Sequence, residues 1–366
     1  MKVPFNALTL TDDAADVKAA IERVVASGWY ILGPEVEAFE QEFATASGVA
    51  HAVGVGNGTD AIFLILRALD IGPGDEVITS PLSAAFSALA IQMCGARPVF
   101  ADIDPERLTL DPLAAESAVT SRTRAIMPVH LYGQPADMRA FEALAARHNL
   151  ALVEDAAQSQ LATSDGRPVG SIGVAAATSF YPTKNLGALG DGGAILTRDA
   201  ALAARIKRLR NGGQSKRYHH DEPGVNSRLD EMQAAILRAR LQRLPRWTDR
   251  RRAIAAAYRA ALASHGLNAA ALTCPREFDP GHVYHLFPLL TGERDRFQAH
   301  MAAAGIETLI HYPIPIPRQP SMRSANPATC PIADRICSQV VSLPMYPALT
   351  VEAVDLVGAA AAAFRA

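Results

Sequence analysis

The stretch AVGVGNGTDAIFLILRALD, residues 52–70, holds an apolar strand, a glycine-containing turn and an amphipathic helix in direct succession. The run AVGV has the length of a buried strand, and the apolar residues of AIFLILRALD recur at helical spacing. Further strand patterns follow at 76–79, 97–100, 125–129 and 151–154, with helical patterns at 83–95 and 137–149 between them. This alternation implies right-handed crossovers and a mainly parallel sheet covered on both faces. The predicted fold class is therefore α/β.

The pattern changes after about residue 174. The runs AAATSFY and GGAILT (175–181 and 192–197) are predicted strands joined by a loop. A long helix is predicted over 227–244, with Ser227 and Asp230 as a capping box and Pro245 as its end. An arginine-rich helical segment, a strand at 285–290 and a helix at 294–305 come next. We therefore predict a large domain over 1–245 and a smaller one over 246–366.

The amino-acid composition argues against several classes of function. The chain has 366 residues, of which 20% are charged and 49% are hydrophobic, and its formal net charge is −2. This balance is that of a soluble globular protein and offers no electrostatic case for binding nucleic acid or an acidic membrane. The four cysteines show no C-x-x-C spacing, so neither a metal site nor a redox pair is predicted. The first residues show no signal-peptide pattern, and the apolar run VGAAAAAF is too short to span a bilayer, which predicts a cytoplasmic protein.

Ligands of open α/β sheets bind outside the carboxyl ends of the strands, so residues at these ends matter most. The first strand runs through Gly56-Asn57-Gly58-Thr59-Asp60 directly into a helix. The unpaired N–H groups of a helix start, together with the Thr59 hydroxyl, suit a phosphate group. The alternative is a plain strand–helix turn, because neither G-x-G-x-x-G nor a Walker lysine is present.

Two more residues at strand ends suggest a cofactor site beside the predicted phosphate site. Asp155 follows a buried strand, with Gln158 three residues later, and is either a helix N-cap or the partner of a cofactor's ring nitrogen. Lys184 lies in SFYPTKNLGALGDGG (179–193) and is one of only five lysines among 35 basic residues. It is either an exposed loop lysine or an amine that forms a Schiff base with an aldehyde. A phosphate site, an acid and a lysine in this chain order are the parts that pyridoxal 5'-phosphate (PLP) requires.

The chain also resembles the DegT/DnrJ/EryC1/StrS family of PLP-dependent sugar aminotransferases, which belong to fold type I. The resemblance is carried, in the family's order, by GPEVEAFEQEFA (33–44), VGNGTDAI (55–62), GARPVFADID (95–104), PVHLYGQPADM (128–138), VEDAAQS (153–159), SFYPTKNLGALGDGGA (179–194), RNGGQSKRYHH (210–220), GVNSRLDEMQAAIL (224–237), GIETLIHYP (305–313) and SLPMYP (342–347). It implies a large domain with a mainly parallel seven-stranded sheet between helices and a smaller α+β C-terminal domain.

The resemblance also implies roles for particular residues. Lys184 would be the catalytic Schiff-base lysine and proton shuttle, and Asp155 would pair with the pyridine nitrogen. Gln158 would contact the ring hydroxyl. The residues that would hold the cofactor phosphate are Gly58, Thr59 and Ser179, with Asn226 reaching the phosphate of a partner subunit in a homodimer. The residues that match positions near the substrate are Tyr181, Arg228, His311 and Tyr312.

Two departures from the family pattern concern the ring and the sugar. Ala84 occupies the position where relatives place an aromatic residue on the PLP ring, and Phe86 follows two residues later. Either Phe86 stacks on the ring, or another group covers it; the alternative for Phe86 is a core residue. The family's histidine after H-Y-P-x-P is Pro317 here, followed by Arg318 and Gln319, which leaves the identity of the sugar open.

The function implied by the resemblance is amino transfer from L-glutamate to the keto group of a keto-deoxysugar linked to dTDP, UDP or GDP. The product would serve amino-sugar biosynthesis for a surface polysaccharide, such as lipopolysaccharide, or for an antibiotic. Alternatives are a cyclitol ketone or other non-nucleotide acceptor, a PLP-dependent sugar dehydratase, and a PLP-binding regulatory protein without turnover. Dehydratase relatives carry histidine in place of Lys184. A nicotinamide-dependent oxidoreductase is disfavoured because the G-x-G-x-x-G fingerprint is missing from the first strand–helix turn.

Overall fold

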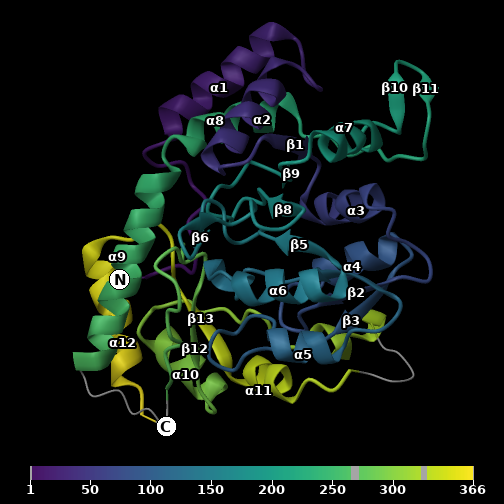
Figure 1. Ribbon diagram of the computed structural model, residues 1–366. Helices are drawn as coiled ribbons and strands as arrows, with labels where there is room; N and C mark the ends of the chain where they lie inside the picture. The colour runs from purple at the N-terminus through teal and green to yellow at the C-terminus, as the bar shows by residue number, and fades with distance from the viewer. Residues whose placement is uncertain (1, 265–271, 323–327, 366) are drawn as a thin grey trace.

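The computed structural model describes residues 2–264, 272–322 and 328–365 (Figure 1). Its main sheet has seven strands in the order β1-β9-β8-β5-β4-β2-β3. The strands are β1 (His51–Val55), β2 (Glu76–Thr79), β3 (Arg97–Phe100), β4 (Thr123–Met127), β5 (Ala151–Asp155), β8 (Ala175–Ser179) and β9 (Gly193–Thr197). All neighbouring pairs from β8 to β3 are parallel, and β9 runs antiparallel to both β1 and β8. The predicted α/β class with a mainly parallel seven-stranded sheet is confirmed.

Helices cover both faces of this sheet. One face packs against α3 (Gly58–Ala68), α4 (Phe86–Met93) and α7 (Ala200–Leu209). The other packs against α2 (Pro34–Ala46), α5 (Pro112–Ser117), α6 (Met138–His148) and α8 (Glu231–Leu241). Adjacent strand residues serve opposite faces: Ile126 packs toward α6, and Ala125 and Met127 pack toward α3. Burial on both sides explains why the strands read as continuous apolar runs.

The C-terminal part has a core of its own. It contains α9 (Leu244–Ser264), α10 (Arg294–Ala303), α11 (Pro331–Gln339), α12 (Val351–Ala363) and the antiparallel pair β12 (Phe287–Leu290) and β13 (Val340–Leu343). Helices α9 and α12 lie side by side in Figure 1 and enclose this core with the strand pair. Val3 packs into the same core and pairs with Ile306, so the first residues lie against the C-terminal part. The domain boundary at residue 245 stays a prediction.

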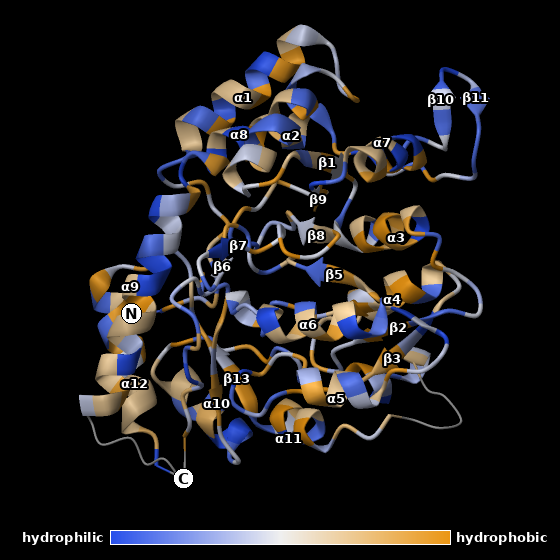
Figure 2. Cartoon of the chain, in the orientation of Figure 1, coloured by the Kyte–Doolittle hydropathy of each residue, from blue (hydrophilic) through white to orange (hydrophobic). Residues whose placement is uncertain are grey.

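Shorter elements connect these layers. They are α1 (Ala14–Ser27), β6 (Thr163–Ser164), β7 (Arg167–Pro168), β10 (Gln214–Lys216), β11 (His219–His220), η1 (Leu131–Gly133), η2 (Ile316–Arg318) and η3 (Pro320–Met322). The β10–β11 hairpin projects from the body beside α7 and is hydrophilic along its length (Figure 2). No helix of the described ranges is long and apolar enough to cross a membrane.

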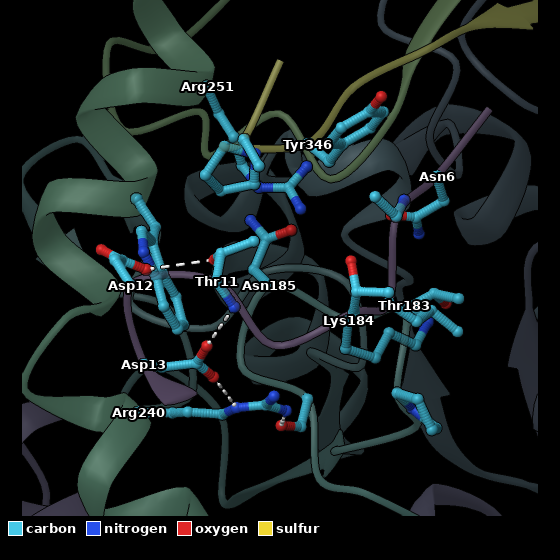
Figure 3. Close-up of a pocket in the computed structure, with 18 of the residues that line it drawn as sticks. Asn6, Thr11, Asp12, Asp13, Thr183, Lys184, Asn185, Arg240, Arg251 and Tyr346 are labelled. Atoms are coloured by element: carbon cyan, nitrogen blue, oxygen red, sulfur yellow. Dashed lines mark hydrogen bonds and ion pairs between the residues drawn. The ribbon is translucent and has the colours of Figure 1, made fainter. Parts of the chain in front are cut away.

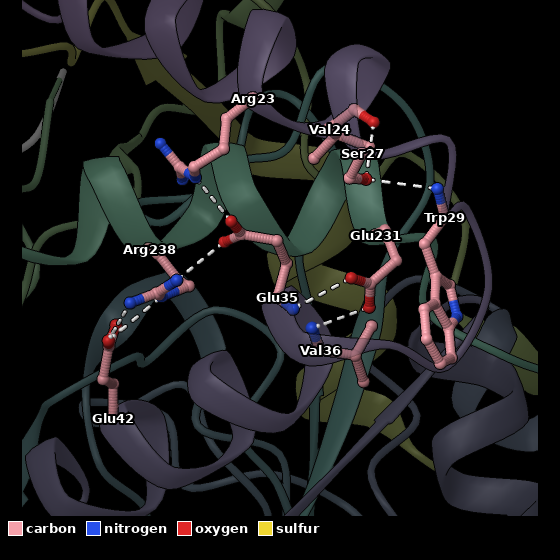
Figure 4. A network of polar contacts seen from close by, with 9 residues as sticks. All are labelled: Arg23, Val24, Ser27, Trp29, Glu35, Val36, Glu42, Glu231 and Arg238. Atoms are coloured by element: carbon pink, nitrogen blue, oxygen red, sulfur yellow. Dashed lines mark hydrogen bonds and ion pairs between the residues drawn. The ribbon is translucent and has the colours of Figure 1, made fainter.

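The start of α2 depends on a residue almost 200 positions away. The buried Glu231 carboxylate accepts hydrogen bonds from the backbone N–H groups of Gly33, Glu35 and Val36 at 2.8–2.9 Å. A carboxylate here satisfies the unpaired donors of the helix and matches its dipole. Arg238, two turns along α8, binds Glu35 and Glu42 of α2 (Figure 4). These contacts hold α2 and α8 together.

The predicted capping box on α8 is wrong. The Ser227 hydroxyl accepts from the Gly56 N–H at 3.0 Å and donates to Asp60 at 2.6 Å, and Asp230 makes no capping bond with its side chain. Ser227 therefore ties the segment before α8 to the turn before α3. The predicted helix also divides in two, because α8 ends at Leu241 and Pro245 lies in the first turn of α9, where a missing N–H costs nothing.

Candidate active site

The carboxyl edge of the sheet carries a cavity of about 1070 Å³. Strands β5 and β8 are parallel neighbours, so Asp155 and Ser179 end at the same edge. The loop 180–192 leaves β8 there and re-enters the sheet at Gly193, which pairs with both Val55 and Ser179. The predicted site residues that line the cavity are Gly58, Thr59, Phe86, Asp155, Gln158, Ser179, Tyr181, Lys184, His311 and Tyr312.

The predicted phosphate residues lie together. Asn57 caps α3, and its side-chain oxygen accepts from the Asp60 N–H at 2.9 Å. Gly58 follows, and a Cβ there would lie only 2.9 Å from the Cβ of Ser179. The first N–H groups of α3 thus lie against Ser179, and the helix itself provides no acceptor for them. This end of the cavity is suited to an anion.

Asp155 also lines the cavity and is buried. Its carboxylate accepts hydrogen bonds from the Ser87 hydroxyl at 2.7 Å and from the Ala157 N–H at 3.1 Å. Residues 156–162 form turns and not a helix, so the N-cap interpretation of Asp155 is wrong. Ser87 comes from α4, 68 residues earlier in the chain. No local sequence signal pointed to Ser87.

Lys184 is a half-buried lysine in a firmly held loop, not the exposed surface lysine of the alternative reading. Its amine forms no hydrogen bond or ion pair with any other residue that the structure describes. Burial lowers the Lys184 pKa from 10.5 to about 8, and the charge of Asp155 opposes this shift. A neutral amine is therefore accessible near physiological pH.

The loop around Lys184 is held from several sides. Within it, the Ala188 N–H donates to the Phe180 carbonyl at 2.7 Å, and the Lys184 N–H donates to the Tyr181 carbonyl at 2.8 Å. From outside, Arg240 of α8 donates to the Gly187 carbonyl at 2.5 Å. A Cβ on Gly187 would lie 2.5 Å from the carbonyl oxygen of Pro182, so only glycine fits this tight turn. These contacts restrict where the amine can go.

A hydrogen-bonded chain joins Gln158 to the segment 311–312. The Tyr132 N–H donates to the side-chain oxygen of Gln158 at 2.7 Å, and the Tyr132 hydroxyl donates to the His311 carbonyl at 2.5 Å. The Gln158 amide nitrogen donates to the Tyr312 hydroxyl at 3.1 Å, which leaves it one further hydrogen to donate. Tyr132 was not among the predicted site residues, since nothing in PVHLYGQPADM distinguishes it from a core aromatic.

The histidines beside Lys184 are held neutral. Burial and the charge of Lys184 lower the pKa of His311 to about 4. His285, which also lines the cavity, has its pKa lowered well below the usual value by burial and then by Lys184 and Arg251. Burial raises the pKa of Tyr312 to about 12. At neutral pH these groups therefore act as neutral hydrogen-bonding partners.

The remaining predicted residues are distributed inside and outside this cavity. Phe86 begins α4, lines the cavity and is 62% exposed, so the interpretation of Phe86 as a core residue is wrong; Ala84 lines the cavity beside it. Pro317 is buried in η2, and Arg318 forms an ion pair with Asp334 at 2.7 Å. Neither residue lines the cavity. Asn226 is exposed and Arg228 donates to the Asn211 side chain at 3.1 Å; neither lines the cavity of its own chain.

The polar groups that line the cavity match the groups that PLP requires. The helix start and Ser179 can hold the phosphate, Asp155 can accept from a protonated ring nitrogen, and the unpaired Lys184 amine can reach an aldehyde. No group of three or more candidate metal ligands occurs among the described residues. The fold and these residues together define a PLP-dependent enzyme of fold type I.

Comparison with known proteins identifies the family. The chain belongs to the DegT/DnrJ/EryC1/StrS aminotransferase family, whose model matches residues 11–362. It is 49% identical to a dTDP-3-amino-3,4,6-trideoxy-alpha-D-glucose transaminase of Streptomyces venezuelae, over 95% of this chain and 92% of that protein. It is 44% identical to a UDP-N-acetyl-3-dehydro-alpha-D-glucosamine 3-aminotransferase of Acidithiobacillus ferrooxidans, over 92% of this chain and 90% of that protein.

A solved structure agrees with this family assignment. The crystal structure of DesV from S. venezuelae, in complex with a ketimine intermediate, superposes with a TM-score of 0.94 at 47% identity, covering 99% of this chain and 98% of that one. The chain is therefore a PLP-dependent aminotransferase, and the oxidoreductase and non-catalytic alternatives are set aside.

Proposed function

We propose that the enzyme transfers an amino group from L-glutamate to the keto group of a nucleotide-linked keto-deoxysugar. The single observation that carries the chemistry is the Lys184 amine, whose pKa is lowered to about 8 and which lines one cavity with Asp155. The acceptor class is supported by the two relatives, both named for an amino or keto group at C3 of a nucleotide-linked sugar. We infer that C3 is the position aminated here.

The residues divide the work as follows. PLP supplies an electron sink that makes a C–H bond next to the substrate nitrogen acidic. In the donor half-reaction, the neutral Lys184 amine would accept the proton from that carbon and pass it to the cofactor. In the acceptor half-reaction, the same amine would deliver a proton to the sugar carbon. The Asp155 carboxylate, oriented by Ser87, keeps the ring nitrogen protonated, and Gln158 donates to the ring hydroxyl. Gly58, Thr59 and Ser179 hold the phosphate.

The remaining cavity wall is assigned to the sugar. Tyr181, His311 and Tyr312 line it, and the hydrogen-bonded chain through Tyr132 orients the last two. Phe86 is an exposed aromatic side chain of this lining that can cover the ring. His311 is held neutral and its Nδ1 is already hydrogen-bonded to the Ser342 hydroxyl, so its Nε2 is the ring nitrogen left for a sugar hydroxyl.

We propose a homodimer with shared active sites. Asn226 and Arg228 do not line their own cavity, yet Ser227 between them is hydrogen-bonded to the turn before α3. Asn226 is exposed and adjoins Ser227, and we propose that its side chain reaches the cofactor phosphate of a partner subunit. Trp29, Tyr30 and Ile31 are exposed aromatic and aliphatic side chains that such an interface would bury.

Two contextual assignments complete the proposal. We place the enzyme in the cytoplasm, where free thiols persist, because all four cysteines are unpaired. We place its product in a surface polysaccharide or an antibiotic, the two uses of amino sugars in this family.

The proposal is tested with a panel of 3-keto and 4-keto sugars linked to dTDP, UDP or GDP, incubated with the holoenzyme and L-glutamate. Amination replaces the keto oxygen and is read as a mass shift in the product. We expect a 3-keto sugar nucleotide to be aminated, with Lys184→Ala as the inactive control. If a free cyclitol ketone is aminated and no sugar nucleotide is, the acceptor class is wrong. Loss of water from the sugar without amination would indicate a dehydratase.

A further inference from the structure

A second cavity, of about 610 Å³, also borders the Lys184 loop (Figure 3). Its walls come from residues 6–13, the loop 182–189, the arginines of α8 and α9, and residues 346–348. Asn6, Thr183 and Lys184 line this cavity and also the one described above. The two spaces therefore share the wall that carries the reactive amine.

Arg251 is the unusual group in this second cavity. It is 4% exposed, and its Nη1 donates to the carbonyls of Tyr284, His285 and Met345 at 2.7–3.3 Å. Its Nε is buried without a partner, and no carboxylate pairs with the guanidinium among the residues that the structure describes. In Figure 3 the side chain extends toward Asn185, on the same side of the cavity as Tyr346. A buried cation that contacts only carbonyls lacks the counter-charge that its burial requires.

The charge balance of the lining is also one-sided. Four arginines, Arg240, Arg246, Arg250 and Arg251, line the cavity together with two carboxylates, Asp12 and Asp13. Both carboxylates are already used, since Asp13 pairs with Arg240 at 2.8 Å and Asp12 pairs with Arg246. Arg250 donates to the Leu349 carbonyl and not to an acid. The cavity is therefore positively charged around Arg251.

We propose that Arg251 binds an anionic group of a substrate, namely the side-chain carboxylate of the amino donor. The inference rests on the proposed function, in which that donor is L-glutamate. The carbon that reacts must lie near the Lys184 amine, and Lys184 lines both cavities, so a carboxylate two methylene groups from that carbon can extend toward Arg251. The diphosphate of the sugar nucleotide is the other anion available, and the test separates the two.

The first experiment measures the donor half-reaction alone, from the cofactor's visible absorbance, with no sugar present. The holoenzyme is mixed with L-glutamate or with L-norvaline, in which a methyl group replaces the side-chain carboxylate. We expect wild type to prefer glutamate. In Arg251→Lys and Arg251→Gln, the half-saturating glutamate concentration should rise about 10- to 100-fold, as expected for losing a charged hydrogen bond, while the norvaline values stay unchanged. The control is Arg252→Gln, one residue along α9, which contacts Asp249 and the His282 carbonyl and lies outside the cavity lining.

A binding measurement removes the dependence on turnover. Glutarate, which has two carboxylates and no amine, and dTDP and UDP are titrated into the holoenzyme by calorimetry. Arg251 variants should bind glutarate more weakly and the nucleotides equally. If the nucleotides are weakened and glutarate is not, the carboxylate assignment is overturned.

A second variant tests the proposal without changing Arg251, in case the Arg251 variants do not fold. Ala348 is an exposed residue of the same lining, so Ala348→Glu adds a negative charge without disturbing buried contacts. It should weaken glutarate binding about threefold or more by charge repulsion, and unchanged binding overturns the proposal. If wild type reacts with glutamate but the Arg251 variants react equally well, the inference alone is wrong. If wild type neither reacts with glutamate nor binds glutarate, the donor in the proposed function is wrong and the inference falls with it.

Discussion

The titration of Lys184 offers the sharpest test of the active-site chemistry. With a pKa of about 8, about one Lys184 side chain in four is neutral at pH 7.5, against about one in a thousand at the ordinary value of 10.5. Desolvation thus raises the concentration of the nucleophilic form by about two orders of magnitude. An arginine at this position stays protonated because its pKa exceeds 12.

The expected consequences follow from these fractions. Lys184→Arg should lower transaminase turnover by at least about 10²- to 10⁴-fold, the usual contribution of a positioned acid–base group. In wild-type apoenzyme, the rate at which added PLP becomes covalently attached should rise with pH around a midpoint of about 8. The Asp155→Asn change should move this midpoint downward, because the Asp155 charge favours the protonated amine.

The assay follows the visible absorbance of the attached cofactor between pH 6 and 10, with Lys184→Ala as the variant that cannot attach it. Far-ultraviolet circular dichroism at each pH checks that the apoenzyme stays folded. A midpoint near 10.5, or substantial turnover by Lys184→Arg, would refute the argument that burial activates this amine.

Three further predictions test the surrounding structure. Gly58→Ala brings a methyl group against the serine that ends β8 and should raise the Kd for PLP, measured by absorbance titration of the apoenzyme, whereas Gly292→Ala, in open space, should not. Tyr132→Phe removes the hydrogen bond to the His311 carbonyl and should raise the KM for the sugar about fivefold, about 1 kcal/mol, with the cofactor spectrum unchanged; an unchanged KM would show that this bond does not position the segment. The folded-state pKa values of His282 and His311, about 3 and 4, lie below the unfolded value of 6.5. The free energy of unfolding should therefore be highest above pH 6.5 and should fall as the pH drops toward 4. The expected loss is about 1.4 kcal/mol per histidine and pH unit. Urea unfolding at pH 7, 6 and 5 measures this loss, and equal midpoints at pH 7 and 5 would contradict it.

The sequence was most informative where function depends on neighbours along the chain. The strand–helix alternation and the identity of strand-end residues such as Asp155 are local properties, because a strand end is set by the apolar run before it. The helix ends were predicted less well. The Ser227 hydroxyl donates to Asp60, 167 residues away, so it does not cap α8 although the local sequence matches a capping box.

By itself, then, the sequence determined the α/β class, the order of phosphate turn, acid and lysine, and the resemblance to the aminotransferase family. Only the tertiary structure decided which side chains orient them. Ser87 reaches Asp155 from helix α4, and Tyr132 links Gln158 to His311. Arg251 is buried beside the Lys184 loop with no carboxylate partner in the part of the chain that the structure describes. The physical reason is that hydrogen bonding and desolvation depend on distances through space, which the packing of separate segments sets and no local pattern encodes.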